Sequence, residues 1–337
     1  MRRHTGRTDT PAPSRLPPAW RAQVAAIRDD HTSGAAALTA QAVAALGALA
    51  ARLADSSVGA DTARPSALLR AAVEELAAAQ PVMAPLRRLG WSVLIAAGNQ
   101  ADAATVAGAV RAAAAAFIAA MQAHQEQAAI HAAMLLPSQA AVLTHSASSA
   151  VEAALRRAYA AGRLAHVTCL EARPLCEGRA LAQHLAAAGI PTTLAVDALA
   201  ARLVGDMDAV LVGGDTVAPG GLINKAGTAA LALAARACRV PVYAVCPSEK
   251  LLPRLPRTRR PARQRRGFAV PDRAQPPEEV HAAAPPGVAV ANYYFDRTPL
   301  HYLTAIVTEA GPLSPPQVRS QASGLLPPSQ GQVRAKP

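Results

Sequence analysis

The stretch VLVGGDTVAPGGLINKAGT, residues 210–228, joins an apolar run to a cluster of polar residues. The run stops at Gly213, Gly214 and Asp215, and a Pro-Gly-Gly turn follows. Asn224 and Lys225 come next, at a point that reads as the start of a helix. In open α/β sheets, ligands bind beyond the carboxyl ends of the strands. The stretch therefore predicts a buried strand with a binding site at its carboxyl end.

The sequence around this stretch predicts its architecture. From residue 141 onward, short apolar runs such as AVLTHS, AHVTCLEA and VPVYAVC alternate with helical segments, a pattern typical of βαβ units and of a parallel sheet covered by helices on both faces. Before residue 136, Leu, Val and Ala recur at spacings of three and four, as in helices. We expect an α/β protein with an all-helical domain at 19–136, a Rossmann-like domain at 137–320, and disordered tails at 1–18 and 321–337.

The positive charge of the chain is concentrated in a few places. The net charge is +12 over 337 residues, and much of the excess lies in the N-terminal tail and in a loop at 253–275, where arginines alternate with prolines. Such composition is typical of a disordered loop rather than of a basic helix face. A polyanion could bind there through counterion release. We therefore keep nucleic acid as a disfavoured partner.

Several classes of protein are disfavoured by the sequence. The apolar stretch at 103–120 carries Arg111 and is mostly alanine, so we expect no membrane contact and a cytoplasmic protein. The four cysteines and nine histidines lack metal-ligand spacing, so no metal site is expected. No GxGxxG follows the first predicted strand, which disfavours a nicotinamide oxidoreductase. We expect no cofactor.

The polar residues at the predicted strand ends suggest a site for a small anion. Arg173 and Lys225 could neutralise a phosphate, and the main-chain amides of Gly213 and Gly214 could donate hydrogen bonds to it. Asp215, desolvated at the end of a strand, is the candidate acid/base. His145 is a weaker candidate, because it neighbours Ser146 on a strand and adjacent side chains point to opposite faces.

Five segments together resemble a known superfamily. They are LTHSASSAV, LEARPLCEGRALA, AGIPTTLAVDALA, VLVGGDTVAPGGLINKAGT and NYYFDRTPLHYLTAIVTEAGPLSPP, in this order along the chain. They are similar to the superfamily that joins the alpha, beta and delta subunits of translation initiation factor 2B to isomerases of methylthioribose 1-phosphate and ribose 1,5-bisphosphate. The resemblance implies a helical N-terminal domain, a Rossmann-like C-terminal domain, and a homodimer or higher homo-oligomer.

The chain departs from the isomerase pattern at its reactive positions. The isomerases use an aspartate, retained as Asp215, and a cysteine, whose place Ser146 takes. An alcohol titrates far above a thiol and is a poor proton relay. Two family arginines are replaced by Ser33 and Gln80, and a family glutamine has become Glu177. The remaining family residues, as expected ligand contacts, are Gly34, Arg173, Asn224, Lys225 and Lys250.

These departures leave three interpretations. The favoured one is an initiation factor 2B-like protein that binds a phosphorylated sugar or nucleotide without the standard isomerase chemistry. The alternative is an aldose-ketose isomerase that acts on a ribose 1-phosphate-type substrate, with Asp215 as acid/base and Ser146 as an orienting hydroxyl. The third is an RNA-associated protein that acts through the arginine-rich loop. With two arginines lost, a monophosphate fits the pocket better than a bisphosphate.

Overall fold

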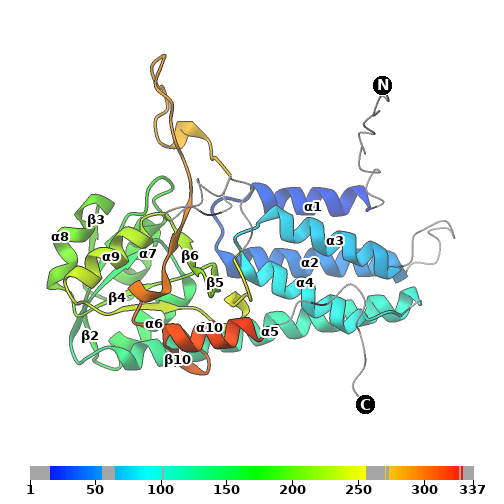
Figure 1. The fold of residues 1–337 in the computed structure, drawn as a ribbon, viewed down its shortest axis with the longest axis horizontal. Helices are drawn as coiled ribbons and strands as arrows, with labels where there is room; N and C mark the ends of the chain where they lie inside the picture. The colour runs from blue at the N-terminus through cyan, green and yellow to red at the C-terminus, as the bar shows by residue number, and fades with distance from the viewer. Residues whose placement is uncertain are drawn as a thin grey trace, which may run out of the picture.

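The computed structural model describes residues 16–54, 65–100, 102–255, 270, 273–325 and 328. Five helices come first and pack as a bundle around a core of Leu, Val and Ala side chains (Figure 1). Their bounds are α1 (Pro18–Asp29), α2 (Ala35–Ala54), α3 (Pro65–Ala79), α4 (Ala84–Ala97) and α5 (Ala103–Leu135). The Asp102 carboxylate caps α5 by accepting a hydrogen bond from the Thr105 amide at 2.7 Å.

After α5 the chain builds, together with covering helices, a seven-stranded sheet in the order β10-β9-β7-β4-β1-β2-β3. Its pairs are parallel except for β10 against β9. The strands are β1 (Ala140–His145), β2 (Leu164–Leu170), β3 (Thr192–Ala195), β4 (Ala209–Val212), β7 (Val242–Val245), β9 (Ala305–Thr308) and β10 (Gly311–Leu313). The central strands β1 and β4 are almost wholly buried, because helices cover both faces of the sheet.

The two faces of the sheet have separate cores. Val142 packs with the end of α5 and with α6 (Ser149–Ala160) and α7 (Glu177–Ala187), whereas its neighbour Leu143 packs on the opposite face. There the covering helices are α9 (Thr228–Ala237) and α10 (Pro315–Ser323), near the short α8 (Ala200–Leu203). These alternating contacts confirm the predicted α/β class, with a helical N-terminal region and a mostly parallel sheet.

A second, three-stranded antiparallel sheet lies beside the first. It consists of β5 (Thr216–Ala218), β6 (Gly221–Lys225) and β8 (Phe295–Thr298), in the order β5-β6-β8. The prediction that Asn224 and Lys225 begin a helix is therefore wrong: they end β6, and α9 begins at Thr228. Their strand is stabilised by pairing with residues 295–298, far away in the sequence, and no local pattern shows that pairing.

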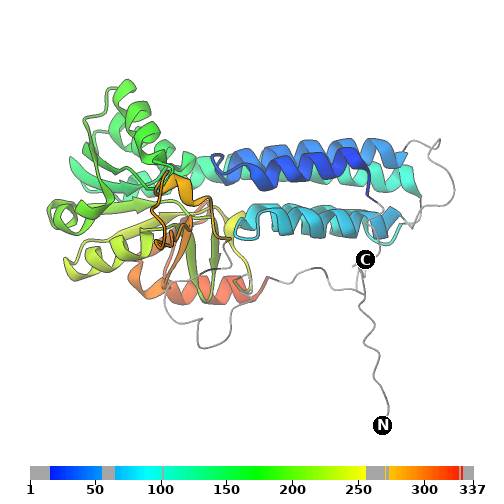
Figure 2. The same ribbon diagram turned by 90° about the horizontal axis from the view of Figure 1, so that it is seen from above.

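Helix α5 runs from the bundle to the sheet, as the view from above shows (Figure 2). Both α2 and α5 are long and apolar enough to cross a membrane by length and composition alone. In the structure α2 lies along α5 within the bundle, and the C-terminal end of α5 packs on the sheet, as core helices do.

Parts of the predicted organisation lie outside the described residues. This holds for residues 1–15, for most of the arginine-rich loop (256–269, 271 and 272), and for 326, 327 and 329–337. Leu16 is buried, and α10 continues to Ser323, beyond the residue where the C-terminal tail was expected to begin. The division into two domains at residue 136 stays a prediction.

Candidate functional site

A cavity of about 780 Å³ lies where the helical bundle meets the carboxyl ends of the sheet strands. Its volume is in the range of small-molecule sites. The walls come from the loop between α1 and α2, the segments after β1, β4 and β7, the end of β6, and the first turns of α6 and α7. Of the predicted site residues, the cavity is lined by Gly34, Ser146, Gly214, Asp215, Asn224, Lys225 and Lys250.

Ser146 follows β1 directly and lies in a left-handed backbone conformation, with φ at 66°. This conformation is uncommon for a residue with a side chain, and it clusters at functional sites. Ser146 is buried, and its hydroxyl makes no hydrogen bond with any described residue. Two residues on, Ser148 caps α6. The hydroxyl is therefore available to a ligand in the cavity.

Asp215 lies between β4 and β5 and is held by its main chain. Its amide donates to the Ile223 carbonyl at 2.8 Å, and its carbonyl accepts from the Ala84 amide at 3.0 Å, so it ties β6 to the start of α4. Within the described chain, its carboxylate has no hydrogen-bond partner. Burial raises the pKa of this carboxyl, and Lys250 and Lys225 only partly oppose the shift. A carboxyl with a raised pKa holds its proton more readily than an exposed one, which suits it to acid-base chemistry.

Lys225 is buried and paired with the Glu177 carboxylate, which lies in the first turn of α7. Its ammonium also lies 4.9 Å from the ring centre of Tyr294 and 5.7 Å from that of Phe295. Cation-π contacts of this kind stabilise a desolvated cation. Glu177 thus neutralises Lys225, which the sequence suggested for phosphate binding.

Asn224 is turned to the start of α9, where its amide donates to the Thr228 hydroxyl at 3.0 Å.

The two glycines after β4 are required by close packing. A Cβ at Gly213 would lie 2.8 Å from the Ser148 side chain, and one at Gly214 would lie 2.4 Å from Leu222. Gly214 lines the cavity, but Gly213 does not. The predicted amide contact from Gly213 therefore has no counterpart in this cavity. Gly213 lets the end of β4 approach the start of α6, and Gly214 lets it approach Leu222 on β6.

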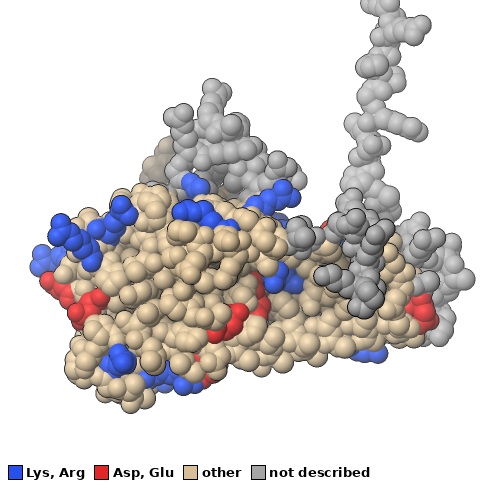
Figure 3. Space-filling view, turned by 60° about the horizontal axis from the view of Figure 1, so that its bottom comes forward, with Lys and Arg blue, Asp and Glu red and all other residues tan. Residues whose placement is uncertain are grey.

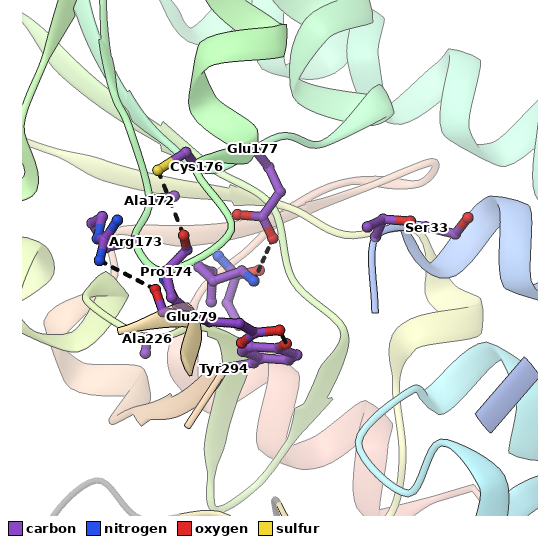
Figure 4. A network of polar contacts seen from close by, with 12 residues as sticks. Ser33, Ala172, Arg173, Pro174, Cys176, Glu177, Ala226, Glu279 and Tyr294 are labelled. Atoms are coloured by element: carbon purple, nitrogen blue, oxygen red, sulfur yellow. Dashed lines mark hydrogen bonds and ion pairs between the residues drawn. The ribbon is translucent and has the colours of Figure 1, made fainter. Parts of the chain in front are cut away.

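Arg173 does not line the cavity, which contradicts the expectation that it meets Asp215 and Lys225 there. Asp197 accepts hydrogen bonds from the amides of Ala172 and Arg173 at 2.8 and 2.7 Å and so orients this turn. The guanidinium then donates to the carbonyls of Glu279 and Val280 at 3.3 and 3.4 Å. In Figure 4 the Arg173 side chain reaches this segment, apart from the Glu177 carboxylate.

Ser33 and Gln80, which stand where the isomerases have arginines, lie in different environments. Ser33 lines the cavity from the loop before α2 (Figure 4). Gln80 also lines it, but its amide donates to the main-chain carbonyls of Ile27, Arg28 and Asp30 at 2.9, 3.3 and 3.3 Å. Gln80 therefore fixes the end of α1 rather than contributing a charge.

Other residues near Ser146 are not aimed into the cavity. One ring nitrogen of His145, Nε2, lies 2.9 Å from the Ala226 carbonyl, and Nδ1 lies 3.6 Å from the Asp197 carboxylate. His145 is buried and does not line the cavity. Cys246 packs against Gly214, and burial raises the pKa of its thiol to about 12. Neither residue offers a proton-transfer group at the cavity wall.

Charges of both signs line the cavity. The acidic residues outnumber the basic ones although the whole chain is basic: Asp29, Asp30, Glu152, Glu177, Asp215 and Glu249 face Arg28, Lys225, Lys250 and Arg273. On the face drawn in Figure 3, Lys and Arg form separate groups rather than a continuous patch. Among the described residues, no group of three His, Cys, Asp or Glu side chains could hold a metal ion.

Comparison with known proteins gives consistent matches. The model of the Initiation factor 2 subunit family matches residues 32–315. A methylthioribose-1-phosphate isomerase of Chloroflexus aurantiacus is 37% identical over 203 residues, which cover 55% of this chain and 56% of that protein. A ribose 1,5-bisphosphate isomerase of Archaeoglobus fulgidus is 36% identical over 175 residues, covering 52% and 54%. The chain thus spans about half the length of the curated relatives it matches.

Two solved structures match over most of the chain. The translation initiation factor eIF-2B of Pyrococcus horikoshii superposes with a TM-score of 0.73 at 25% identity, covering 89% of this chain and 98% of that one. A 5-methylthioribose 1-phosphate isomerase of the same organism gives a TM-score of 0.66 at 25% identity, covering 90% and 86%. The fold is therefore shared by factors and enzymes, and the fold alone does not decide between them.

Proposed function

The chain belongs to the Initiation factor 2 subunit family, and from this premise we propose that it is an aldose-ketose isomerase acting on a ribose 1-phosphate-type substrate. The observation that carries the proposal is Asp215: its carboxylate faces a ligand-sized cavity, has no hydrogen-bond partner in the described chain, and has a raised pKa because it is buried. The names of the curated relatives favour this alternative over a non-catalytic binding protein.

The cavity supplies contacts that suit one phosphate. Lys250 lines it, and so do the first turns of α2 and α6, whose amides have no acceptors within their own helices. Helix N-termini bind phosphate through these amides and the helix dipole. Lys225 is neutralised by Glu177, so its contribution to anion binding is weakened. A sugar monophosphate therefore fits the cavity better than a bisphosphate.

The chemistry requires proton transfer at two places. When the ring of a 1-phosphorylated aldose opens, the ring oxygen needs a proton, and the proton on C2 must be removed before one is added to C1. Asp215 in its protonated form suits the first task as general acid. The Ser146 hydroxyl suits the orientation of a substrate hydroxyl.

Turnover is the direct test. The purified chain is incubated with ribose 1-phosphate, methylthioribose 1-phosphate and ribose 1,5-bisphosphate, and the ketose product is followed by NMR. We expect turnover of a monophosphate and a loss of about 100-fold or more in Asp215→Asn, because acid-base catalysis contributes that much or more. Asp29→Asn is the matched control, since Asp29 lines the cavity but is paired with Arg28. No turnover of any of the three sugars would refute the proposal.

A second function is favoured by Ser146 itself. With an alcohol in place of the family thiol, the same cavity would serve as a sensor site that binds a phosphorylated sugar or nucleotide without turnover. That protein would show a ligand-dependent rise in thermal stability, because a ligand at 100 times its Kd adds about 2.7 kcal/mol. Stabilisation by a sugar phosphate without product favours the sensor.

The partners remain proposals as well. We propose a homodimer or larger homo-oligomer in the cytoplasm, and light scattering on the purified chain would measure its mass. The RNA interpretation concerns the loop at 253–275, most of which lies outside the described residues. Deleting residues 256–269 would reduce the salt dependence of RNA binding if the loop carried it.

A further inference from the structure

We propose that Glu177 is the second proton-transfer residue of the site and takes the role that Ser146 cannot fill. The inference rests on the proposed isomerase function and names the group that removes the proton from C2 of the substrate. It accounts for two departures from the isomerase pattern together: the loss of a thiol at 146 and the gain of a carboxylate at 177.

The position of the Glu177 carboxylate suits this role. Glu177 lies in the first turn of α7 and lines the same cavity as Ser146 and Asp215. One carboxylate oxygen, Oε1, contacts the Lys225 ammonium, whereas Oε2 is buried and has no hydrogen-bond partner. A buried acceptor without a partner is costly, and such groups in native proteins call for an explanation. The side chain as a whole keeps 18% of its surface exposed, and a substrate in the cavity would meet the carboxylate there.

Glu177 is also held firmly in place. A Cβ at Gly178 would lie 1.9 Å from the Leu170 carbonyl oxygen, so the missing side chain lets α7 begin directly against the end of β2. The ion pair with Lys225 fixes the carboxylate from the other side, and Tyr294 supports the ammonium. Figure 4 shows the Glu177 carboxylate with this contact dashed. Proton transfer is efficient when the base is positioned in advance.

Glu249 is another carboxylate of the cavity, and it too has one buried oxygen without a partner among the described residues. Its other oxygen lies 2.5 Å from His124 on α5, so it is held by the helix rather than by a lysine of the cavity. Glu177 is a like charge near Asp215 and is among the causes that raise the pKa of its carboxyl. Glu177 is therefore the carboxylate that works together with Asp215.

The reaction then balances without an outside oxidant. Protonated Asp215 gives its proton to the ring oxygen as the bond from C1 to that oxygen breaks, and ionised Glu177 takes the proton from C2. The electron pair of the C2–H bond forms a C1–C2 double bond. Asp215 next takes the proton of the 2-hydroxyl while Glu177 returns its proton to C1. C2 is oxidised to a ketone, C1 is reduced, and both carboxyls regain their starting states.

The test uses the whole chain and three variants: Glu177→Gln, Ser146→Cys/Glu177→Gln, and Glu171→Gln. Glu171 does not line the cavity and is paired with Arg179 at 2.6 Å, so its variant controls for the loss of one negative charge. The readouts are kcat, ligand affinity by calorimetry, and release of deuterium from C2-labelled substrate into water. The affinity measurement shows that each variant is folded and binds.

We expect Glu177→Gln to lower kcat and deuterium release by about 100-fold or more while it still binds ligand. Ser146→Cys in this background restores at least part of both, because the thiol supplies a titratable group, and Glu171→Gln keeps normal activity. If turnover persists in Glu177→Gln, or if the thiol of the double variant does not restore the turnover lost in Glu177→Gln, the role of Glu177 is overturned while the proposed isomerase function stands. No turnover by the unaltered chain would overturn the proposed function and this role with it.

Discussion

Asp296 makes the stability of this protein depend on pH in the direction opposite to that of most carboxylates. It lies on β8, opposite Asn224 in the register. Its Oδ2 accepts hydrogen bonds from the amides of Gly227 and Ala229 at 2.8 and 3.1 Å, at the start of α9. Its Oδ1 is buried without a partner. Burial outweighs the two hydrogen bonds and raises the pKa from 3.8 to about 6.

The magnitude follows from this shift. The difference between 6 and 3.8 is 2.2 units, and at ~1.36 kcal/mol per unit it corresponds to about 3 kcal/mol. Since the folded-state pKa is raised, the favourable contribution is fully present below pH 3.8 and is lost as the pH rises through about 6. The side chain in Asp296→Asn cannot ionise, so the free energy of unfolding of this variant does not fall through this titration as the pH rises. The difference in free energy of unfolding between the unaltered chain and Asp296→Asn should therefore change by up to about 3 kcal/mol from pH 4 to pH 7.

Urea unfolding followed by circular dichroism at half-unit pH steps measures this difference. Asp102→Asn is a matched control, because Asp102 also caps a helix but is exposed, and its hydrogen bonds to Thr105 lower the pKa of its carboxyl. Its contribution is present at neutral pH and is lost only in acid, so its difference curve stays flat from pH 5 to pH 7. If the curves for Asp296→Asn and the unaltered chain ran parallel from pH 4 to pH 7, the reasoning about burial would be refuted.

Two further predictions concern the packing of the site. Lys225→Met should lower the free energy of unfolding by up to ~3–5 kcal/mol, because Glu177, whose side chain is only 18% exposed, is left unpaired. Adding Glu177→Gln should recover part of this loss, and equal unfolding energies for the single and double variants would contradict the prediction. Gly178→Ala should cost ~1–3 kcal/mol or more, since its Cβ meets main-chain atoms. Gly108→Ala, which meets no atom within 4 Å, should be neutral or stabilising in the same urea titration.

The fold and much of the site follow from short-range patterns. Alternating apolar runs and helical segments predicted the parallel sheet, and the Gly-Gly-Asp sequence after β4 predicted a carboxylate at the carboxyl end of a strand. These features depend on neighbours a few residues apart, which the sequence displays directly. Asp215, Lys225 and Lys250 do line one cavity.

What the sequence did not reveal depends on contacts between distant segments. Asn224 is in a strand because residues 295–298 pair with it, and Arg173 points to the 279–280 segment because Asp197 holds its turn. The change to Glu177 was visible in the sequence, but its pairing with Lys225 was not. The signal available in the sequence was that a position with a neutral residue in the isomerases carries an acidic residue here, while Lys225 is kept. A new acid together with a kept lysine suggests that the two form an ion pair.

Helix α5 has a mechanical consequence for how a ligand enters. At 33 residues and ~1.5 Å per residue it is a rod of about 50 Å, and it packs against α2 and α4 at one end and against α6 and β9 towards the other. A single unbroken helix that belongs to both halves resists a wide swing of one half about the other. We therefore expect ligand entry to involve local rearrangement at the cavity rim, to which the turn between α1 and α2 contributes.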